Sequence, residues 1–583
     1  METNILPRPE HPQPMFKREN WQNLNGEWSF YNDHGIGPHS EALIKPFNVE
    51  IYPQKILVPF CPESELSGIK NKDFMKSVWY KRAITVTEEQ IDGRVLLHFG
   101  AVDYETDVYV NGEKVGSHFG GYSSFFFDIT DYINIGENDI TVNAMDNMQN
   151  IPSGKQCRDS YNPYGCLYTR TTGIWQTVWL EYVPNGYIKT AKYYPDIKKT
   201  AFDIELILSK PGKVAVEAFY EGKLVGNAAS EAEGNYLRFT LPLNEKHLWE
   251  AGNGRLYDLK FTFETEDGTD EMFSYAGLRE IRLDGFRFML NGKSIFLRTV
   301  LDQGYYHDGI YTASTDDDLK RDIEISMQIG FNGARLHEKI FEPRFLYHCD
   351  KAGYLVWGEH ANWGVSLESG EGFLNFLPEW SETVERDFNH PAIIGWCPLN
   401  ETWCSTSKTA QRIIEAIYRE TKRLDPTRPV IDTSGFCHVI TDIYDQHDYQ
   451  QNTEKFRESY INYNGKRDSF KFDDSQKQKY IPDLPLYVSE YGGLKWVCED
   501  KKDLVPENAW GCGTPETEKE FFDRYEAFAY AMLDAPNIMG FCYTQLYDVE
   551  QEVNGLYTYG REKKFDDYSR IIDANTKKAN IED

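Results

Sequence analysis

From about residue 279 to its end, the chain alternates short apolar runs with amphipathic helical patterns. One such pattern, "TDDDLKRDIEISMQIG", carries a capping box from Thr315 to Asp318 and a stop at Gly330, which predict a helix between two strands. Eight strands that alternate with helices over about 300 residues are typical of a (β/α)8 barrel. The eight apolar runs are "IFLRTVLDQ", "NGARLH", "YLVWGE", "PAIIGWCPLN", "RPVIDTS", "TDIYDQHDY", "PLYVSEYGG" and "NIMGFCYTQLYD".

Two β-rich blocks precede this region. Residues 1–185 show short alternating runs, and the pair Asn111-Gly112 between two of them is a strong hairpin signal. This block predicts a jelly-roll β-sandwich. Residues 186–278 show the same short alternating runs over a shorter length, which predicts an immunoglobulin-like β-sandwich. We therefore expect three domains, 1–185, 186–278 and a catalytic barrel over 279–583.

Composition narrows the possible partners and compartments. The net charge of −30 argues against nucleic acid and anionic membrane surfaces as partners. The first residues show no apolar signal-peptide segment, and no run of 18 apolar residues occurs, so we expect a cytoplasmic protein without a membrane span. The ten cysteines show no CxxC spacing, which favours reduced thiols over disulfides or a zinc site. We predict no metal and no cofactor.

Polar side chains follow most of the apolar runs, at the point where the predicted strand ends. In β/α barrels the chemistry lies at these carboxyl ends. Any one of these residues could be a solvated loop start, but seven of the eight runs end in this way, which indicates one shared pocket. The residues in question are Asp302, Arg335, His337, Glu359, His360, Asn400, Glu401, Asp445, His447, Asp448, Glu490, Gln545 and Asp548.

Two carboxylates, Glu401 and Glu490, end the fourth and seventh runs, which lie on opposite sides of an eight-stranded ring. Retaining glycoside hydrolysis requires two carboxyl groups about 5 Å apart, one held protonated as the acid and one ionised as the nucleophile. If Glu490 is the ionised partner, its charge should raise the pKa of Glu401. The pair predicts a retaining glycosidase.

Three segments resemble glycoside hydrolase family 2, the retaining β-glycosidases that include β-galactosidases, β-glucuronidases and β-mannosidases. They are "RDFNHPAIIGWCPLNE" (386–401), "LYVSEYGG" (486–493) and "NGARLH" (332–337). The resemblance covers nearly the whole chain and implies the same domain order. It further implies that Glu401 is the general acid/base, that Glu490 is the nucleophile, and that Asn400 binds the sugar 2-hydroxyl. Arg335 would be the charge partner of Glu490, and Tyr449 would lie close to the nucleophile.

The identity of the sugar is the open question. β-Glucuronidases of this family carry an Asn-x-Lys pair near the last strand, but the comparable stretch "EQEVNGLYTYGREKKF" has Asn554 followed by Gly555 and Leu556. We therefore expect an exo-acting β-galactosidase-like enzyme. A β-hexuronidase (glucuronidase or galacturonidase) and an α-L-arabinopyranosidase remain alternatives, and Lys339 or Arg561 could serve a carboxylate. A non-catalytic carbohydrate-binding protein is a more remote reading.

The expected partner is a carbohydrate or glycoside, and a homo-oligomer is possible because family members are commonly dimers or tetramers. Trp496, six residues beyond Glu490, is the preferred candidate for a ring that stacks on the sugar. The full set of predicted substrate-binding residues is Asn400, Arg335, Asp302, His337, Glu359, His447, Asp448, Tyr449, Trp496 and Lys339.

Overall fold

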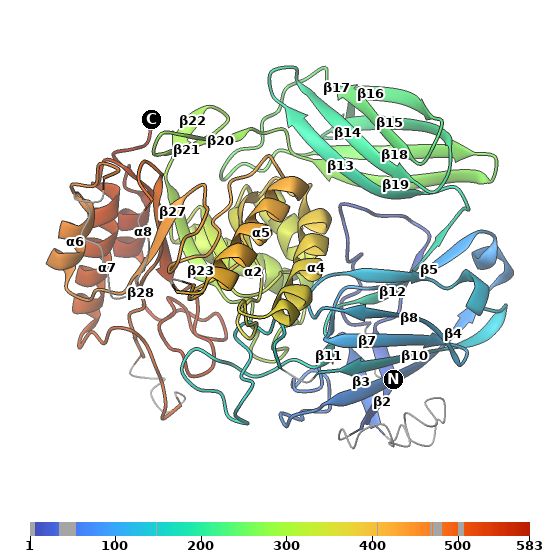
Figure 1. Cartoon of the computed structure of the whole chain (residues 1–583), viewed down its shortest axis with the longest axis horizontal. Coiled ribbons are helices and arrows are strands. Elements are labelled where there is room, and N and C mark those ends of the chain that lie inside the picture. Colours follow the sequence, from blue (N-terminus) through green and yellow to red (C-terminus); the bar gives the residue numbers. More distant parts are fainter. Residues whose placement is uncertain are drawn as a thin grey trace.

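The computed structural model describes residues 6–33, 54–146, 149–404, 406–466, 469, 481–498 and 506–583. Two β-sandwiches precede a β/α barrel, which confirms the predicted fold class. In Figure 1 the barrel (yellow to red) lies beside both sandwiches, the first (blue) at the lower right and the second (green) at the upper right. Within the described residues, no helix has the length and apolar character needed to cross a bilayer.

The first sandwich packs a six-stranded sheet against a four-stranded one. The predicted hairpin at Asn111-Gly112 joins β7 and β8, and both residues have positive φ, 50° and 88°, as a tight two-residue turn requires. Alternate residues of the strands face a core of branched and aromatic side chains. The larger sheet has the order β3(Gln54–Val58), β2(Gly26–Asn32), β4(Ser77–Val86), β10(Gly136–Met145), β7(Glu105–Val110), β8(Glu113–Phe119), and the smaller has the order β1(Trp21–Asn23), β12(Val178–Val183), β5(Arg94–Phe99), β9(Phe125–Asp128).

The second sandwich is antiparallel throughout, with a core of its own. Its two sheets are β13(Ile188–Asp196), β14(Ala201–Leu208), β17(Tyr236–Pro242) and β16(Lys223–Ala232), β15(Gly212–Tyr220), β18(Tyr257–Thr265), β19(Gly268–Ala276). A small sheet of β20(Ile281–Asp284), β21(Arg287–Leu290) and β22(Lys293–Ile295) then leads into the barrel.

Seven parallel strands form the barrel sheet, and most are buried along their whole length because helices cover the outside. Sequence order is kept around the ring, and β23 pairs with both β24 and β29. The sheet order is β26(Ile393–Cys397), β25(Leu355–Glu359), β24(Gly333–Leu336), β23(Leu297–Asp302), β29(Ile538–Thr544), β28(Leu486–Gly492), β27(Tyr444–Asp448).

Residues 428–434, the predicted fifth strand, lie between β26 and β27. No strand is assigned to this described segment; it forms only two parallel bridges, Trp396 to Val430 and Asn400 to Ser434. Backbone bonds from Ser434 N to Leu399 O (2.7 Å) and from Glu401 N to Ser434 O (2.8 Å) hold it against the end of β26. The segment therefore fixes the backbone at Glu401, and it reaches β27 through the Ser434 hydroxyl, which donates to Asp445 Oδ2 (2.6 Å).

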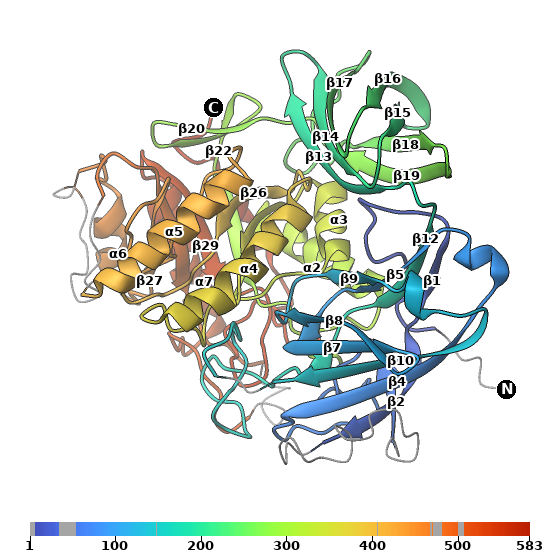
Figure 2. The same cartoon turned by 45° about the vertical axis from the view of Figure 1, so that its right-hand side comes forward.

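A helix follows each barrel strand. The predicted capping box begins α2, where Thr315 accepts from Asp318 N, and Leu319 and Ile323 face the core. Figure 2 shows α4 and α5 side by side on the outside of the strands. The helices are α2(Asp316–Gln328), α3(Pro343–Ala352), α4(Gly370–Asp387), α5(Lys408–Leu424), α6(Thr453–Tyr460), α7(Glu518–Leu533) and α8(Ser569–Thr576).

The long connection between β10 and β11(Gly173–Ile174) leaves the first sandwich and binds the barrel loops (Figure 1). Ser153 Oγ donates to Trp363 O (2.8 Å), and Gln551 Nε2 donates to Gly165 O (2.8 Å) and Leu167 O (2.9 Å). Side chains of the first sandwich thereby reach the carboxyl-end face of the barrel.

Candidate active site

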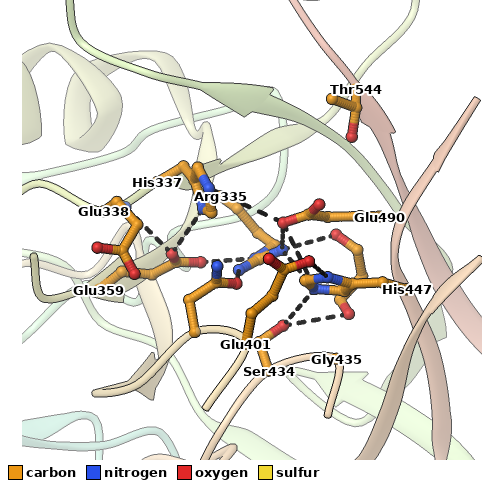
Figure 3. A network of polar contacts seen from close by, with 12 residues as sticks. Arg335, His337, Glu338, Glu359, Glu401, Ser434, Gly435, His447, Glu490 and Thr544 are labelled. Atoms are coloured by element: carbon orange, nitrogen blue, oxygen red, sulfur yellow. Dashed lines mark hydrogen bonds and ion pairs between the residues drawn. The ribbon is translucent and has the colours of Figure 1, made fainter. Parts of the chain in front are cut away.

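Two carboxylates face each other at the carboxyl end of the barrel (Figure 3). Single oxygens of Glu401 and Glu490 and one ring nitrogen of His447 all lie within 4.8 Å of one another. Among the described residues, this is the only set of three or more carboxylate, thiol or imidazole groups whose ligand atoms lie this close together. Their hydrogen bonds to one another and to Arg335 use the same oxygens, so we assign them acid–base chemistry.

Local backbone geometry points both carboxylates at this space. Glu490 lies on β28, which is buried at every residue. Glu401 follows β26 with φ at 45°, the left-handed region, which ordinary side chains enter mainly at functional sites. Its side chain is 24% exposed, whereas that of Glu490 is 6% exposed, so Glu401 is the carboxylate open to a leaving group and to water.

Arg335, at the end of β24, is the hub of the polar network in Figure 3. The buried guanidinium donates from Nη1 to Glu490 Oε1 (3.0 Å), from Nε to Glu359 Oε1 (2.5 Å) and from Nη2 to Asn400 Oδ1 (3.1 Å). Arg335 thus lies beside Glu490, where the predicted charge partner of this carboxylate is expected. Because Arg335 fixes Oδ1 of Asn400, Nδ2 is left over, and within the described part of the chain this buried amide nitrogen has no partner. A sugar hydroxyl would satisfy it.

Glu490 is held in its ionised form. Burial raises the pKa of Glu490, but the positive charges of His447 and Arg335 beside it bring the pKa below its ordinary value of 4.5. Of these, Arg335 carries a permanent charge. Tyr449 donates its hydroxyl to Glu490 Oε2 at 2.5 Å, which agrees with the position predicted for this tyrosine.

His337 and Glu359 support Arg335 from the far side. His337 Nδ1 lies 3.2 Å from Glu359 Oε2, and its Nε2 lies 3.9 Å from Glu490 Oε1. Burial lowers the pKa of His337 well below 6.5, so the ring is neutral and acts as a hydrogen-bond partner. Both residues lie behind the carboxylate pair and orient it.

The prediction that the pKa of Glu401 is raised is wrong. Burial does raise it, but a hydrogen bond from His447, together with the positive charges of His447 and Lys155, lowers the pKa below 4.5. The prediction considered only the charge of Glu490 and did not include these two cations. His447 Nδ1 lies 2.8 Å from Glu401 Oε1, so His447 contacts the proposed acid/base directly.

The structure places four other predicted residues outside this network. Asp302 accepts from Gly304 N (2.9 Å) and Tyr547, and Asp448 accepts from the Tyr460 hydroxyl (2.7 Å). The Trp496 ring stacks on Phe565, with ring centroids 6.2 Å apart. The reason is the same in each case, since these side chains turn toward neighbouring elements of the fold.

Lys339, the fourth, is neither solvated nor near the carboxylate pair. Its ammonium donates to Tyr311 O (2.9 Å) and to Gly304 O, and only 3% of the residue is exposed. Burial lowers its pKa to about 7. Arg561, the other residue considered for a substrate carboxylate, is paired with Asp322 at 2.9 Å. Neither cation is available to a ligand at Glu490.

A large cavity of about 1020 Å³ lies beside this site, between the first sandwich and the loops of the barrel, and its lining does not include Glu401 or Glu490. Trp496 lies on its wall together with several acidic residues, among them Glu63, Asp548 and Glu550. We therefore take the carboxylate pair, and not this larger hollow, as the chemical centre.

Lys155, on the connection between β10 and β11, is a cation that interacts electrostatically with Glu401 and Glu490, and sequence reasoning missed it. It is 6% exposed, and its ammonium lies 3.7 Å from the centroid of the Trp363 ring. Burial lowers its pKa, but Cys166 and the carboxylates Glu401, Glu552 and Glu490 raise it above its ordinary value. It lies in an irregular polar stretch more than 240 residues from Glu401, so no local pattern marks it.

Two family profiles match the chain. Residues 46–184 match "Glycosyl hydrolases family 2, sugar binding domain", and residues 281–493 match "Glycosyl hydrolases family 2, TIM barrel domain". The first match falls on the first sandwich, and the second covers the barrel through β28, including Glu401 and Glu490.

Curated relatives divide between two sugar specificities. A putative β-glucuronidase of Formosa agariphila is 26% identical over 67% of this chain and 47% of its own length. A β-galactosidase of Thermoanaerobacter pseudethanolicus is 26% identical over 66% of this chain and 52% of its own. The chain thus spans about half the length of these two relatives. The β-glucuronidase of Ruminococcus gnavus, solved with D-glucuronic acid, shares the fold with a TM-score of 0.79 at 19% identity, covering 98% of this chain and 100% of that one.

Proposed function

The chain belongs to glycoside hydrolase family 2, and from that premise we propose that it hydrolyses terminal β-glycosides with retention of configuration. The observation that carries the proposal is that single oxygens of Glu401 and Glu490 lie within 4.8 Å of each other. This is close to the spacing of about 5 Å between the carboxyl groups of retaining glycosidases and shorter than the roughly 6.5–9.5 Å of inverting ones. Glu490 attacks the anomeric carbon while Glu401 protonates the leaving oxygen. Glu401 then takes a proton from the water that releases the sugar.

A mechanism-based 2-deoxy-2-fluoro glycoside tests this assignment. It forms the covalent intermediate but is released slowly, so peptide mass spectrometry should find the sugar on Glu490. The configuration of the first-formed product, followed by NMR, should match that of the substrate. A label on a different carboxylate, or an inverted product, would overturn the proposed roles.

For the sugar itself we propose a β-hexuronide ahead of the β-galactoside that the sequence favours. Relatives of both kinds match at the same identity, so they do not favour a galactoside. Lys155 supplies the specific argument: among the described residues its ammonium has neither an ion pair nor a hydrogen bond. The neighbouring Glu552 is already bound by Asn554 Nδ2 (2.9 Å) and Tyr168. A buried cation without an acceptor is costly, and a uronate carboxylate would supply one.

Replacing Lys155 is therefore expected to change the preference of the enzyme between uronides and neutral sugars. Lys155→Met should raise KM for 4-nitrophenyl β-glucuronide or β-galacturonide on the order of 10²-fold, because a charge-assisted contact is lost. The β-galactoside and α-L-arabinopyranoside should change less than about 3-fold, and Lys155→Arg should keep most of the uronide activity. A wild-type enzyme that hydrolyses the β-galactoside and no uronide would refute the uronide proposal and leave the retaining mechanism intact.

A further inference from the structure

His447 lies between the two carboxylates, and its ring is fixed on several sides (Figure 3). Nδ1 lies 2.8 Å from Glu401 Oε1, and Nε2 lies 3.0 Å from Ser434 Oγ and 3.4 Å from Glu490 Oε1. Gly435 makes room for the ring, since a Cβ at this position would lie 2.5 Å from it. His447 therefore holds one orientation, with Nδ1 directed at Glu401.

The hydrogen bonds behind Ser434 decide which nitrogen of His447 carries a proton. Asp445 Oδ2 accepts from Ser434 Oγ (2.6 Å) and from the Ser489 hydroxyl. Because a hydroxyl has a single hydrogen, Ser434 has only its oxygen left for His447, and that oxygen must accept. Arg335 Nη1 also lies 3.4 Å from Nε2, but it has closer acceptors in Ser489 O (2.8 Å) and Glu490 Oε1 (3.0 Å). Nε2 is therefore the protonated nitrogen, whatever the state of Nδ1.

This arrangement requires an ionised Asp445, and a second histidine secures it. His438 Nε2 lies 3.1 Å from Asp445 Oδ1, and His438 Nδ1 lies 2.7 Å from Asp432 Oδ1. All three groups are buried. Burial lowers the pKa of His438, but the two carboxylates raise it to about 10, and His438 in turn holds the pKa of Asp445 below its ordinary value.

With Nε2 protonated, one further proton can lie in the contact between His447 Nδ1 and Glu401. We propose, on the basis of the proposed function, that His447 is a positioning residue that stores this proton and sets the proton affinity of Glu401. The pair can exist as imidazolium with carboxylate or as imidazole with carboxylic acid, and both forms have the same net charge. The general acid/base thus titrates as a Glu401–His447 unit.

The proton balance closes over the two chemical steps. In the first step the proton passes from the unit through the Glu401 carboxyl to the leaving oxygen, while Glu490 forms the bond to the sugar. The unit is then an imidazole with a carboxylate. In the second step the attacking water gives its proton to Glu401, its hydroxyl joins the anomeric carbon, and Glu490 leaves as a carboxylate.

The charges around His447 fix the direction of its pH dependence. Negative charge faces His447 from Glu401 after β26 and from Glu490 on β28, and Asp445 on its own strand acts through Ser434. Positive charge comes from Arg335 on β24. Glu359 and the neutral His337 lie behind Arg335. Burial lowers the pKa of His447, but Glu490 and Glu401 raise it above 6.5. The unit therefore keeps its proton above pH 6.5 and loses it as pH rises through this raised value.

His447→Gln and His447→Asn test the proposal, because an amide cannot store a proton. The measurement is the pH profile of kcat/KM on a phenyl glycoside of the accepted sugar. Glu401 alone releases its proton at lower pH, so the basic limb should move down by at least about 1 pH unit. The acidic limb should move up, because Glu490 loses one of its cations. Ser434→Ala should shift the basic limb less and in the same direction, and His247→Gln, in the second sandwich, should leave both limbs in place.

A 2,4-dinitrophenyl glycoside separates this role from a merely structural one. Its leaving group needs no acid, so kcat/KM for the His447 variants should stay within about 5-fold of the wild type. A comparable loss on both substrates, or unshifted limbs with either amide, would overturn the role of His447. A wild type without glycosidase activity would instead overturn the proposed function itself.

Discussion

Replacing Glu490 by glutamine is expected to reduce turnover of every 4-nitrophenyl glycoside on the order of 10⁴-fold or more. The amide keeps the size of the side chain but lacks the charge and the nucleophilic oxygen that form the glycosyl-enzyme. The carboxylate that it replaces is held by Arg335 Nη1 at 3.0 Å and by Tyr449 at 2.5 Å. Steady-state rates and labelling by the fluoro glycoside would measure the loss, and both should disappear together.

The control for this variant must address stability, because Glu490 belongs to a buried ion pair. Arg335 keeps its ion pair with Glu359, so losing the charge of Glu490 is expected to cost at most about 3–5 kcal/mol, and circular dichroism and thermal unfolding should show that the variant is folded at the assay temperature. Glu415→Gln is a matched exchange on α5 at an exposed ion pair with Arg419, and it should leave turnover unchanged. Ordinary activity in Glu490→Gln would refute the site assignment.

The barrel and its carboxylate pair could be predicted from the sequence because their signals are local. A strand buried on both faces appears as a continuous apolar run, and the first polar residues after it fall on the rim of the pocket. "IIGWCPLNE" and "LYVSEYGG" both have this form, and the structure brings Glu401 and Glu490 together as predicted from it. Residues 428–434 were predicted as a strand of the same kind, yet within the described part of the chain they pair only through two bridges.

Other features of the site depend on the direction of side chains and on contacts between distant segments, which a local sequence pattern does not predict. Asp302 and Lys339 also follow barrel strands, but their side chains turn to Tyr547 and Tyr311. Lys155 reaches the pocket only because the connection after β10 binds the barrel loops. For the same reason a local argument gave the wrong direction for the pKa of Glu401: the decisive cations, His447 and Lys155, come from other parts of the chain.

Removing the side chain of Glu401 is expected to give a loss that depends on the leaving group. In Glu401→Ala, kcat/KM for a phenyl glycoside should fall on the order of 10²–10⁴-fold, because the leaving oxygen is no longer protonated. For a 2,4-dinitrophenyl glycoside the first step should proceed nearly as in the wild type. The second step has lost its base, so the glycosyl-enzyme on Glu490 should accumulate and appear as a burst of dinitrophenol followed by a slow steady state.

Azide should rescue this second step, since the small anion enters the space left by the 24% exposed Glu401 side chain and attacks without a base. The product would be a β-glycosyl azide, whose configuration reports that attack came from the face opposite Glu490. His447 stays in Glu401→Ala and still bears its Nε2 proton, so the variant also shows whether imidazole alone can act as the base. Rescue by azide with little residual hydrolysis means that the histidine works only through Glu401. Full activity without azide would contradict the assignment of Glu401 as the acid/base.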